Sequence, residues 1–287
     1  MLVREMIKRG ETQLNRAHCT DAGIDAERLY CYLQNVDKVK VFLQANDPVE
    51  EATREAYFNL IEERAKRIPL QYITGTQEFM GFPFAVNEDV LIPRQDTEVL
   101  AEQAAKIIGG EGTGVRSRRK WNVLDLCCGS GNVGISLAKI CANAKVTAAD
   151  LSGKAVETAK KNAAANRVKL TFLQGNLFEP VKKKRYDMIV SNPPYIPTHM
   201  IPILQDEIKA HEPLMALDGG EDGLDFYRKI IDRAPVHLSR QGVLILEIGQ
   251  DQAEEVTRLI RDTMTFSKVH VVKDLPGNNR VVYAAAL

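Results

Sequence analysis

One stretch decides the fold of this chain: Val123-Leu124-Asp125-Leu126-Cys127-Cys128-Gly129-Ser130-Gly131-Asn132-Val133-Gly134. It reads as a buried strand, a turn rich in glycine and the first residues of a helix. Gly129, Gly131 and Gly134 satisfy the pattern G-x-G-x-x-G, which is typical of a nucleotide-binding turn at the edge of a parallel sheet. The stretch therefore predicts an α/β domain with a cofactor where this strand ends.

Strand and helix patterns alternate from Trp121 onward. Such alternation predicts an α/β fold with a mostly parallel sheet and helices on both faces, whose ligands bind beyond the carboxyl ends of the strands. The predicted strands are residues 122–127, 145–150, 169–174, 186–191, 242–248, 268–273 and 280–286. The predicted helices are residues 132–142, 153–166, 222–240 and 250–264.

The first part of the chain has a different character. Residues 1–75 show helical spacing of apolar residues and no convincing strand. Residues 76–92, punctuated by Gly81 and Pro83, predict a β-hairpin that joins two domains, and a helix begins near Pro93. We therefore expect a helical domain over 1–75, a hairpin linker over 76–92 and a catalytic domain over 93–287, within which residues 109–120 form a glycine-rich, basic loop.

Composition excludes several classes of protein. The 287 residues are 45% hydrophobic and 26% charged, as in an ordinary globular protein. Lys plus Arg and Asp plus Glu both number 38, so the chain lacks the basic excess of a protein that binds nucleic acid mainly through phosphates. No signal peptide or membrane-length apolar run is evident. The five cysteines show no C-x-x-C spacing, which favours reduced thiols in the cytoplasm and opposes a disulfide framework or a zinc site.

A second informative motif is Asn192-Pro193-Pro194-Tyr195, directly after the predicted strand 186–191. Its two prolines fix φ and lack N–H groups, so the turn is rigid. Such a turn can hold the Asn192 amide, a backbone carbonyl and the Tyr195 ring around one small planar group, either an amide NH2 or the exocyclic amine of a base. The alternative is a proline-capped loop in which Asn192 only caps the turn.

The glycine pattern leaves two kinds of cofactor open. A nicotinamide or flavin dinucleotide is the obvious candidate. Against it, Asp125 would repel a pyrophosphate but attract a cationic cofactor, and Cys127 and Cys128 stand where the pyrophosphate fingerprint makes its tight turn. A dinucleotide also gives the Asn-Pro-Pro-Tyr turn no task. Asp150 does not discriminate, because an acid there can bind the ribose hydroxyls of either cofactor, or else cap the helix that begins near Ser152.

In order and spacing, these motifs resemble those of class I S-adenosylmethionine-dependent methyltransferases that modify a planar nitrogen. More closely, the chain resembles the bacterial protein-(glutamine-N5) methyltransferases of peptide chain release factors, the HemK/PrmC type. The further segments that carry this closer resemblance are Ile68–Gly75, Leu91–Glu98, Glu212–Leu217, Gly220–Leu224 and Asn278–Val281. One departure is Cys127-Cys128, where the family usually has Gly-Thr or Gly-Ser.

The resemblance implies a Rossmann-like methyltransferase domain that binds S-adenosylmethionine and releases S-adenosylhomocysteine. The residues that it implies for cofactor binding are Asp125, Cys127, Cys128, Gly129, Ser130, Gly131, Asp150, Leu151, Asn176, Leu177 and Asn192. It also implies that Asn192 Oδ1 and the Pro193 carbonyl accept the hydrogens of a glutamine amide while Tyr195 covers the amide plane. The residues implied for substrate binding are Asn192, Pro193, Pro194, Tyr195, Arg94 and Glu98.

The implied reaction is methyl transfer to the glutamine of the Gly-Gly-Gln motif in class-1 peptide chain release factors. The helical domain would then hold the protein substrate, and the enzyme would be a cytoplasmic monomer with no metal, no membrane and no stable nucleic-acid partner. Two alternatives remain. One is an amino-methyltransferase of nucleic acid that uses the same turn on a flipped adenine or guanine. The other is a binding module without activity, which the intact catalytic motifs oppose.

Overall fold

The computed structural model describes residues 1–110, 119–182 and 184–287, so most of the predicted loop 109–120 lies outside the described residues. The chain divides into two compact units. One consists of Met1–Thr76 and Gln205–His211, and the other consists of Gln77–Leu204 and Glu212–Leu287. The chain therefore passes from one unit to the other after residues 76, 204 and 211.

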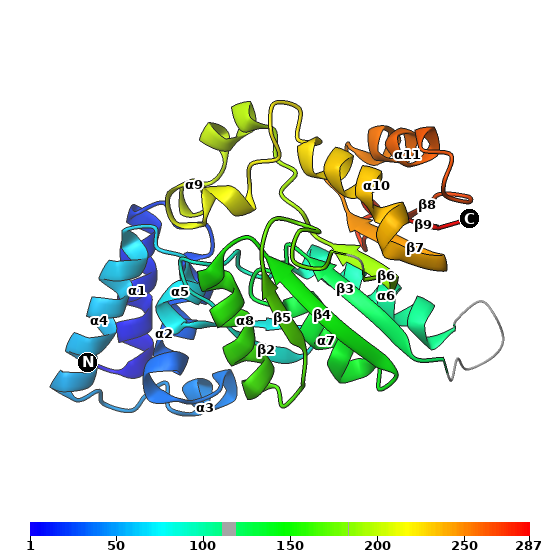
Figure 1. Cartoon of the computed structure of the whole chain (residues 1–287). Coiled ribbons are helices and arrows are strands. Elements are labelled where there is room, and N and C mark those ends of the chain that lie inside the picture. The colour runs from blue at the N-terminus through cyan, green and yellow to red at the C-terminus, as the bar shows by residue number, and fades with distance from the viewer. Residues whose placement is uncertain (111–118, 183) are drawn as a thin grey trace. The chain divides into compact units, whose positions relative to one another are not determined.

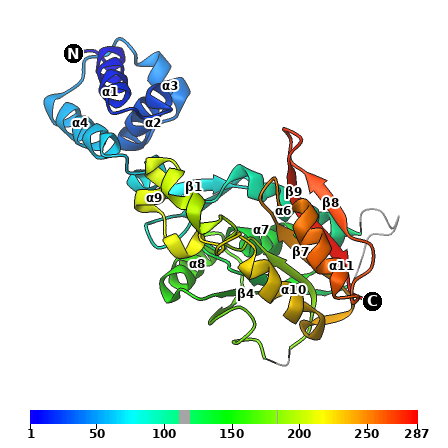
Figure 2. The ribbon, with the colours of Figure 1, turned by 90° about the horizontal axis from the view of Figure 1, so that it is seen from above.

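The first unit is a bundle of short helices (Figure 2). Its helices are α1 (Val3–Arg16), α2 (Ala22–Gln34), α3 (Lys38–Leu43), α4 (Glu51–Ala65), α5 (Leu70–Thr74) and α9 (Asp206–His211). Each of the longer helices buries one apolar face, and Leu29 of α2 and Tyr57 of α4 are fully buried in the shared core. The helical prediction for the start of the chain is therefore confirmed.

A buried cluster of charged side chains binds α9 to α2 and α4. Arg64 Nε donates to Asp25 Oδ2 at 2.7 Å, and Arg64 Nη2 donates to Glu207 Oε1 at 3.0 Å. Arg67 Nη2 donates to Glu207 Oε2 at 2.7 Å. Burial raises the pKa of Asp25, and its hydrogen bond from Arg64 opposes the rise. The sequence predicts no element at α9, because six mostly polar residues carry too little periodicity to indicate a helix.

The second unit contains a seven-stranded sheet with helices on both faces (Figure 1). A hairpin of β1 (Thr76–Phe79) and β2 (Phe82–Ala85) precedes it. The strands of the sheet are β3 (Trp121–Leu126), β4 (Ala144–Asp150), β5 (Thr171–Gln174), β6 (Tyr186–Ser191), β7 (Leu238–Glu247), β8 (His270–Lys273) and β9 (Asn279–Ala285). The helices are η1 (Gln95–Thr97), α6 (Glu98–Gly109), α7 (Asn132–Ile140), α8 (Gly153–Ala165), η2 (Thr198–Ile203), η3 (Leu214–Ala216), α10 (Asp225–His237) and α11 (Ala253–Asp262).

The strand order is β5-β4-β3-β6-β7-β9-β8, and β9 runs antiparallel to both of its neighbours. The remaining pairs are parallel, which confirms the predicted α/β fold with a mostly parallel sheet. The order reverses between β3 and β6, the point at which such sheets bind ligands. Within the described ranges, no helix has both the length and the apolar character needed to cross a membrane.

Side chains alternate between the two faces of the sheet along each strand. In β7, Leu244 and Leu246 pack in the core beneath α10 and α11, whereas Ile245 packs in the core beneath α6 and α7. The same alternation directs Glu247 toward the side of α6. In β3, Val123 packs on the α6 and α7 side, so Asp125, two residues later, lies there as well.

Several element ends differ from the prediction. The helix expected to reach residue 240 ends at His237, and β7 begins at once with Leu238 instead of residue 242. Pro235 lies within the last turn of α10, which ends two residues later at His237. The helix expected near Pro93 begins as the 3-10 turn η1 before α6. The strands expected from residues 169 and 268 begin at Thr171 and His270.

Candidate active site

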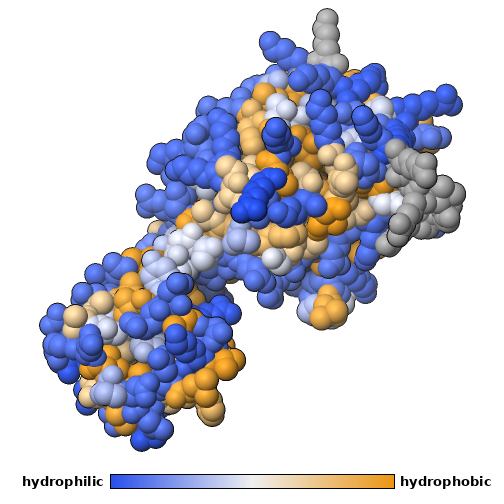
Figure 3. Space-filling model, turned by 90° about the horizontal axis from the view of Figure 1, so that it is seen from below, coloured by the Kyte–Doolittle hydropathy of each residue, from blue (hydrophilic) through white to orange (hydrophobic). Residues whose placement is uncertain are grey.

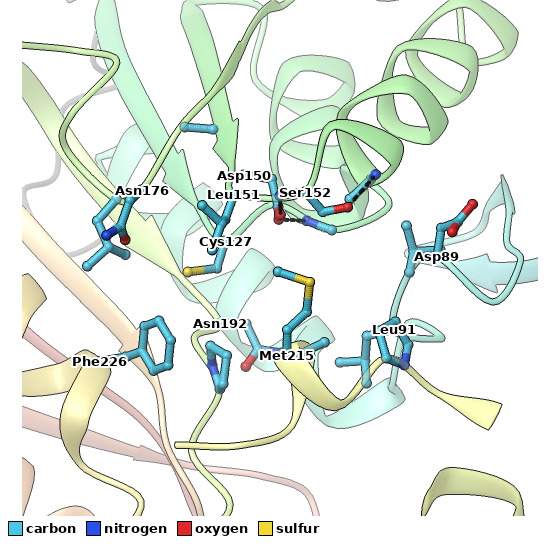
Figure 4. A pocket seen from close by; sticks show the side chains of 18 of the residues that line it. Asp89, Leu91, Cys127, Asp150, Leu151, Ser152, Asn176, Asn192, Met215 and Phe226 are labelled. Atoms are coloured by element: carbon cyan, nitrogen blue, oxygen red, sulfur yellow. Dashed lines mark hydrogen bonds between the residues drawn. The ribbon is translucent and has the colours of Figure 1, made fainter. Parts of the chain in front are cut away.

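A cavity of about 540 Å³ lies at the carboxyl ends of four neighbouring strands (Figure 4). Its wall includes residues that end or follow β3, β4, β5 and β6, because parallel strands bring their carboxyl ends to one edge of the sheet. The residues implied for cofactor binding that line it are Cys127, Gly129, Asp150, Leu151, Asn176, Leu177 and Asn192. The strand-end positions of the sequence motifs thus converge on one site.

Asp150 is held at this cavity by backbone N–H groups. Its Oδ2 accepts from Gly129 N at 2.8 Å, and its Oδ1 accepts from Ser152 N at 2.9 Å. Burial raises the pKa of Asp150, and these hydrogen bonds oppose the rise. Ser152, not Asp150, caps α8, since its Oγ accepts from Ala155 N at 3.2 Å. Each carboxylate oxygen of Asp150 retains a lone pair for a ligand hydroxyl.

Asp125 is fully buried beneath the glycine turn. Its Oδ2 accepts from Gly134 N at 2.8 Å, and a Cβ at residue 134 would lie only 2.7 Å from that oxygen. Burial raises the pKa of Asp125 to about 7, against this hydrogen bond and with a smaller contribution from Asp150. Gly131, at φ 80°, caps α7 and leaves no room for a Cβ beside Ile135. The glycines thus permit close packing of α7 on β3.

The two adjacent cysteines differ in backbone conformation. Cys127 has a φ of 58°, in the left-handed region that glycine favours. This conformation explains why the family that the sequence resembles usually has Gly at this position. Burial raises the pKa of both the Cys127 and the Cys128 thiol. Both side chains are therefore neutral at pH 7 and add no negative charge to that of Asp125 and Asp150.

A second, smaller cavity of about 40 Å³ adjoins the first, with which it shares Leu91, Cys127, Gly129 and Asn192. Its further lining includes Arg94, Thr97, Asp125, Cys128 and Ser130. Among the described residues, Gly131 lines neither cavity and acts through the geometry of the turn. The other predicted cofactor residues are therefore divided between two adjoining spaces.

The Asn192–Tyr195 turn forms part of the wall of both spaces. Asn192 lines both cavities, and its Nδ2 donates to Thr97 Oγ1 at 3.2 Å. Pro194 lines the larger cavity, and Pro193 is buried. The Tyr195 hydroxyl donates to Glu247 Oε1 at 3.3 Å, and burial raises the pKa of this phenol. The turn is therefore bound to η1 through its first residue and to β7 through its last.

Two glycines further along the chain pack directly against this turn. A Cβ on Gly219 would lie 2.7 Å from Tyr195 Cα, and a Cβ on Gly223 would collide with the Tyr195 carbonyl oxygen. The Gln252 side chain donates to the same carbonyl at 2.9 Å. This close approach gives a physical reason for the glycines around the Gly220–Leu224 segment, because any side chain at 219 or 223 would displace the turn.

The two remaining residues implied for substrate binding have partners of their own. Arg94 lines the smaller cavity and forms an ion pair with Glu212. Glu98 Oε1 accepts from Met80 N at 2.6 Å, and within the described part of the chain Glu98 lines neither cavity. Glu98 thus joins α6 to the turn of the β1–β2 hairpin.

Sequence reasoning missed several residues of the site. Met215 and Phe226 line the larger cavity opposite the strand ends (Figure 4). Met215 lies within the Glu212–Leu217 segment, which carries the family resemblance but does not by itself indicate that Met215 lines the cavity. Thr97 and Glu247 also contact the Asn192–Tyr195 turn. Glu247 gave no signal beyond its place at the end of a predicted strand.

Comparison with known proteins gives consistent matches. The family model of the PrmC N-terminal domain matches residues 5–75, and that of the Methyltransferase small domain matches residues 113–209. The release factor glutamine methyltransferase of Geobacter sulfurreducens is 41% identical over 262 residues, which cover 91% of this chain and 89% of that protein. The release factor glutamine methyltransferase of Clostridium botulinum is 34% identical over 288 residues, which cover 99% of each chain.

A solved structure supports the fold. The methyltransferase from Pyrococcus furiosus matches with a TM-score of 0.54 and 19% sequence identity, over 78% of this chain and 98% of that chain. At this identity the likeness concerns the fold alone.

Proposed function

The chain belongs to the family of release factor glutamine methyltransferases, and from this membership we propose that it methylates the side-chain amide nitrogen of the Gly-Gly-Gln glutamine in class-1 peptide chain release factors. The observation that carries the proposal is the Asn192–Tyr195 turn, which lines a cofactor-sized cavity at the switch point of the sheet. A planar amide and a methyl donor can meet there, since Asn192 belongs to both adjoining cavities.

S-adenosylmethionine fits the chemistry of this cavity, and when bound it supplies a methyl group on a positively charged sulfur. Asp150 would accept the two ribose hydroxyls, since its orientation is already fixed by Gly129 and Ser152. Leu177 and Phe226 present apolar surface to an adenine ring, and Asn176 presents an amide to its edge. Asp125, in the adjoining space, would face the cationic part of the cofactor.

The Asn192–Tyr195 turn would activate and orient the substrate amide. An amide nitrogen is a poor nucleophile because its lone pair is delocalised into the carbonyl. Asn192 Oδ1 and the Pro193 carbonyl would accept the two N–H hydrogens and direct the lone pair toward the methyl group. Alignment of this kind contributes ~7–11 kcal/mol to lowering a barrier. Fixed acceptor dipoles in a site that excludes water strengthen the effect.

Tyr195 would cover the plane of the amide and exclude other poses. Its ring is fixed by the hydroxyl contact with Glu247, and its carbonyl is fixed by Gln252. The mechanism needs no strong general base, because the amide proton becomes acidic once the nitrogen is alkylated. The neutral thiols of Cys127 and Cys128 likewise take no part in proton transfer.

The helical unit would bind the body of the release factor. A site that recognises one amide has little area with which to select a protein, and stable partners need ~800 Å² per side. Val39, Phe42 and Leu43 of α3 are 67%, 80% and 75% exposed, and apolar patches interrupt the otherwise polar surface in Figure 3. Exposed apolar groups of this kind suit a protein partner. We place the reaction in the cytoplasm, with the enzyme acting as a monomer and without a stable nucleic-acid partner.

The decisive experiment combines labelled S-adenosylmethionine with purified protein and either a release factor or duplex DNA. We expect one added methyl on the Gly-Gly-Gln glutamine by mass spectrometry and no label in DNA. Asn192→Ala should abolish transfer and leave cofactor affinity largely intact. Asp150→Ala should instead weaken cofactor affinity about tenfold to over a hundredfold, as expected for lost charge-assisted hydrogen bonds. Label in DNA alone, or full activity of Asn192→Ala, would contradict the proposal.

A further inference from the structure

Glu247 is a buried carboxyl group beside the catalytic turn, and the reaction described above uses it only to fix the Tyr195 ring. Leu246 pairs with Ser191, so Glu247 and Asn192 are neighbours at the edge of the sheet. Glu247 is only 1% exposed. Its Oε1 accepts from the Tyr195 hydroxyl, whereas its Oε2 is buried and has no hydrogen-bond partner within the described part of the chain. A buried acceptor left open is costly and needs an explanation.

Thr97 connects this carboxyl group to Asn192. It is 1% exposed at the end of η1, and its Oγ1 accepts from Asn192 Nδ2 at 3.2 Å. Thr97 is also among the groups that lower the pKa of Glu247, so it lies near the carboxyl group, although no hydrogen bond reaches Glu247 Oε2 within the described residues. The Thr97 hydroxyl can thus accept a hydrogen bond from Asn192 and direct its own proton toward Glu247.

The direction of these hydrogen bonds follows from the number of protons available. A threonine hydroxyl has one proton, and while it accepts from Asn192 Nδ2 it must donate that proton elsewhere. An ionised carboxylate can only accept, so Glu247, which already accepts from Tyr195, offers the Thr97 hydroxyl an acceptor in its open Oε2. The Nδ2 end of Asn192 is then committed to Thr97. Its Oδ1 end is left to accept from a ligand in the cavity.

Charged and titratable groups surround Glu247 on several elements. Arg280 of β9 is buried and pairs with Asp96 of η1 at 3.0 Å and with Asp274 at 3.1 Å. Tyr227 of α10 donates to the Glu247 backbone carbonyl at 3.0 Å. Burial raises the pKa of Glu247 to about 7, Thr97, Arg280 and Tyr195 lower it in that order, and Asp96 raises it. The carboxyl group therefore changes charge near neutral pH.

We propose that Glu247 is a positioning residue that acts through Thr97 to set which end of the Asn192 amide faces the substrate, and that it holds the Tyr195 ring over the same group. The inference rests on the proposed function, because the orientation matters only if Asn192 must accept from a substrate NH2. A reversed Asn192 would present its own NH2 to the substrate NH2, and two donors form no hydrogen bond.

Protonation of Glu247 removes this constraint on the orientation of the Asn192 amide. The carboxylic acid is itself a donor, so the Thr97 hydroxyl can accept from it and turn its own proton toward Asn192 Oδ1. That arrangement stabilises the reversed amide, which cannot bind the substrate nitrogen. Activity at saturating cofactor should therefore fall as the pH decreases through the pKa of Glu247.

Matched variants test the inference through kcat at saturating S-adenosylmethionine and release factor. Thr97→Val keeps the shape of the side chain and removes the hydroxyl, and it should lower kcat roughly tenfold to a hundredfold. Thr97→Ser keeps the hydroxyl and should retain most activity. Glu247→Gln imitates the protonated acid, and it should lower kcat by a similar factor and abolish the acidic limb of the pH profile. Combining Thr97→Val with Glu247→Gln should add little further loss, because both act through the same chain.

Cofactor affinity, measured by calorimetry, should stay near the wild-type value in all of these variants, which separates positioning from loss of structure. An active wild type together with Thr97→Val and Glu247→Gln variants that keep its kcat and its acidic limb would overturn the inference. Equal losses in Thr97→Ser and Thr97→Val would overturn it as well. A wild type that leaves the release factor glutamine unmodified would instead contradict the proposed function.

Discussion

At the scale of single residues, the candidate site is distinguished by three buried carboxyl groups at the ends of strands. Burial raises the pKa values of Asp125, Asp150 and Glu247, and each group receives hydrogen bonds from another part of the site. Asp125 is bound to α7 and Asp150 to the glycine turn, while Glu247 is bound to Tyr195. Groups that weaken the fold in their charged form are typical of sites in which activity and stability conflict.

Glu247→Gln is expected to stabilise the fold, and increasingly so as the pH rises. The pKa of Glu247 in the folded chain, about 7, exceeds its ordinary value of 4.5, so the folded state binds this proton more tightly than the unfolded state. The wild type therefore loses free energy of unfolding as the pH rises between these two values. The variant does not titrate at this position. Its free energy of unfolding should therefore exceed that of the wild type by near zero at about pH 4 and by on the order of 1–3 kcal/mol at about pH 8.

Urea unfolding at both pH values measures this difference. Glu221→Gln is the matched control, since Glu221 is exposed and its replacement should leave the free energy of unfolding nearly unchanged. An advantage of Glu247→Gln that is the same at both pH values would show that the carboxyl group does not titrate as described.

At the scale of the element, the order of strands and helices was accessible from the sequence because each strand buries a short apolar run and each helix a periodic face. Asp125, Asp150 and Asn192 were found because they lie at strand ends beside recognisable turns. Glu247 was not, because its importance comes from Thr97 and Tyr195, which are distant in the sequence. The membership of α9 in the helical unit was missed for the same reason, since Glu207 meets Arg64 across a separation of 143 residues.

Arg64→Met is expected to release α9 from the helical unit. Arg64 is buried and pairs with both Asp25 and Glu207, so the substitution leaves two carboxyl groups without their shared partner. Removing one partner of a buried ion pair costs about 3–5 kcal/mol. Hydrogen exchange should report faster exchange in α2, α4 and residues 205–211.

Lys8→Ala provides the control for this experiment. Lys8 pairs with Glu11 on the surface of α1 with its side chain 71% exposed, and loss of such a pair costs less than about 1 kcal/mol. If the two variants exchanged at the same rates in residues 205–211, the buried cluster would not be what retains α9.

At the scale of the whole molecule, the division of labour between the two units can be tested without removing either. Val39→Ser, Phe42→Ser and Leu43→Ser together remove the exposed apolar side chains of α3. If these residues bind the release factor, the combined variant should raise KM for the intact factor about tenfold or more, as expected when apolar anchors of an interface are lost. KM for a short Gly-Gly-Gln peptide should not change, because the peptide lacks the body of the release factor that α3 is proposed to bind.

Leu275→Ser is the matched control, since Leu275 is a fully exposed apolar residue of the other unit. Its KM values for both substrates should equal those of the wild type. Equal increases in KM for the factor and for the peptide in the α3 variant would assign the helical unit a role other than docking.

The pairing of Arg64 with Glu207 also has a consequence for synthesis on the ribosome. Residue 207 is added 143 positions after residue 64. At roughly 5–20 residues per second, Glu207 is added about 7–30 s after Arg64, so Asp25, Arg64 and Arg67 lack the fourth member of their cluster for that time. During that interval the helices already synthesised lack the Glu207 carboxylate that pairs with Arg64 and Arg67. An amino-terminal fragment left by premature termination would lack this carboxylate permanently, and would therefore be a natural substrate for chaperones and proteases.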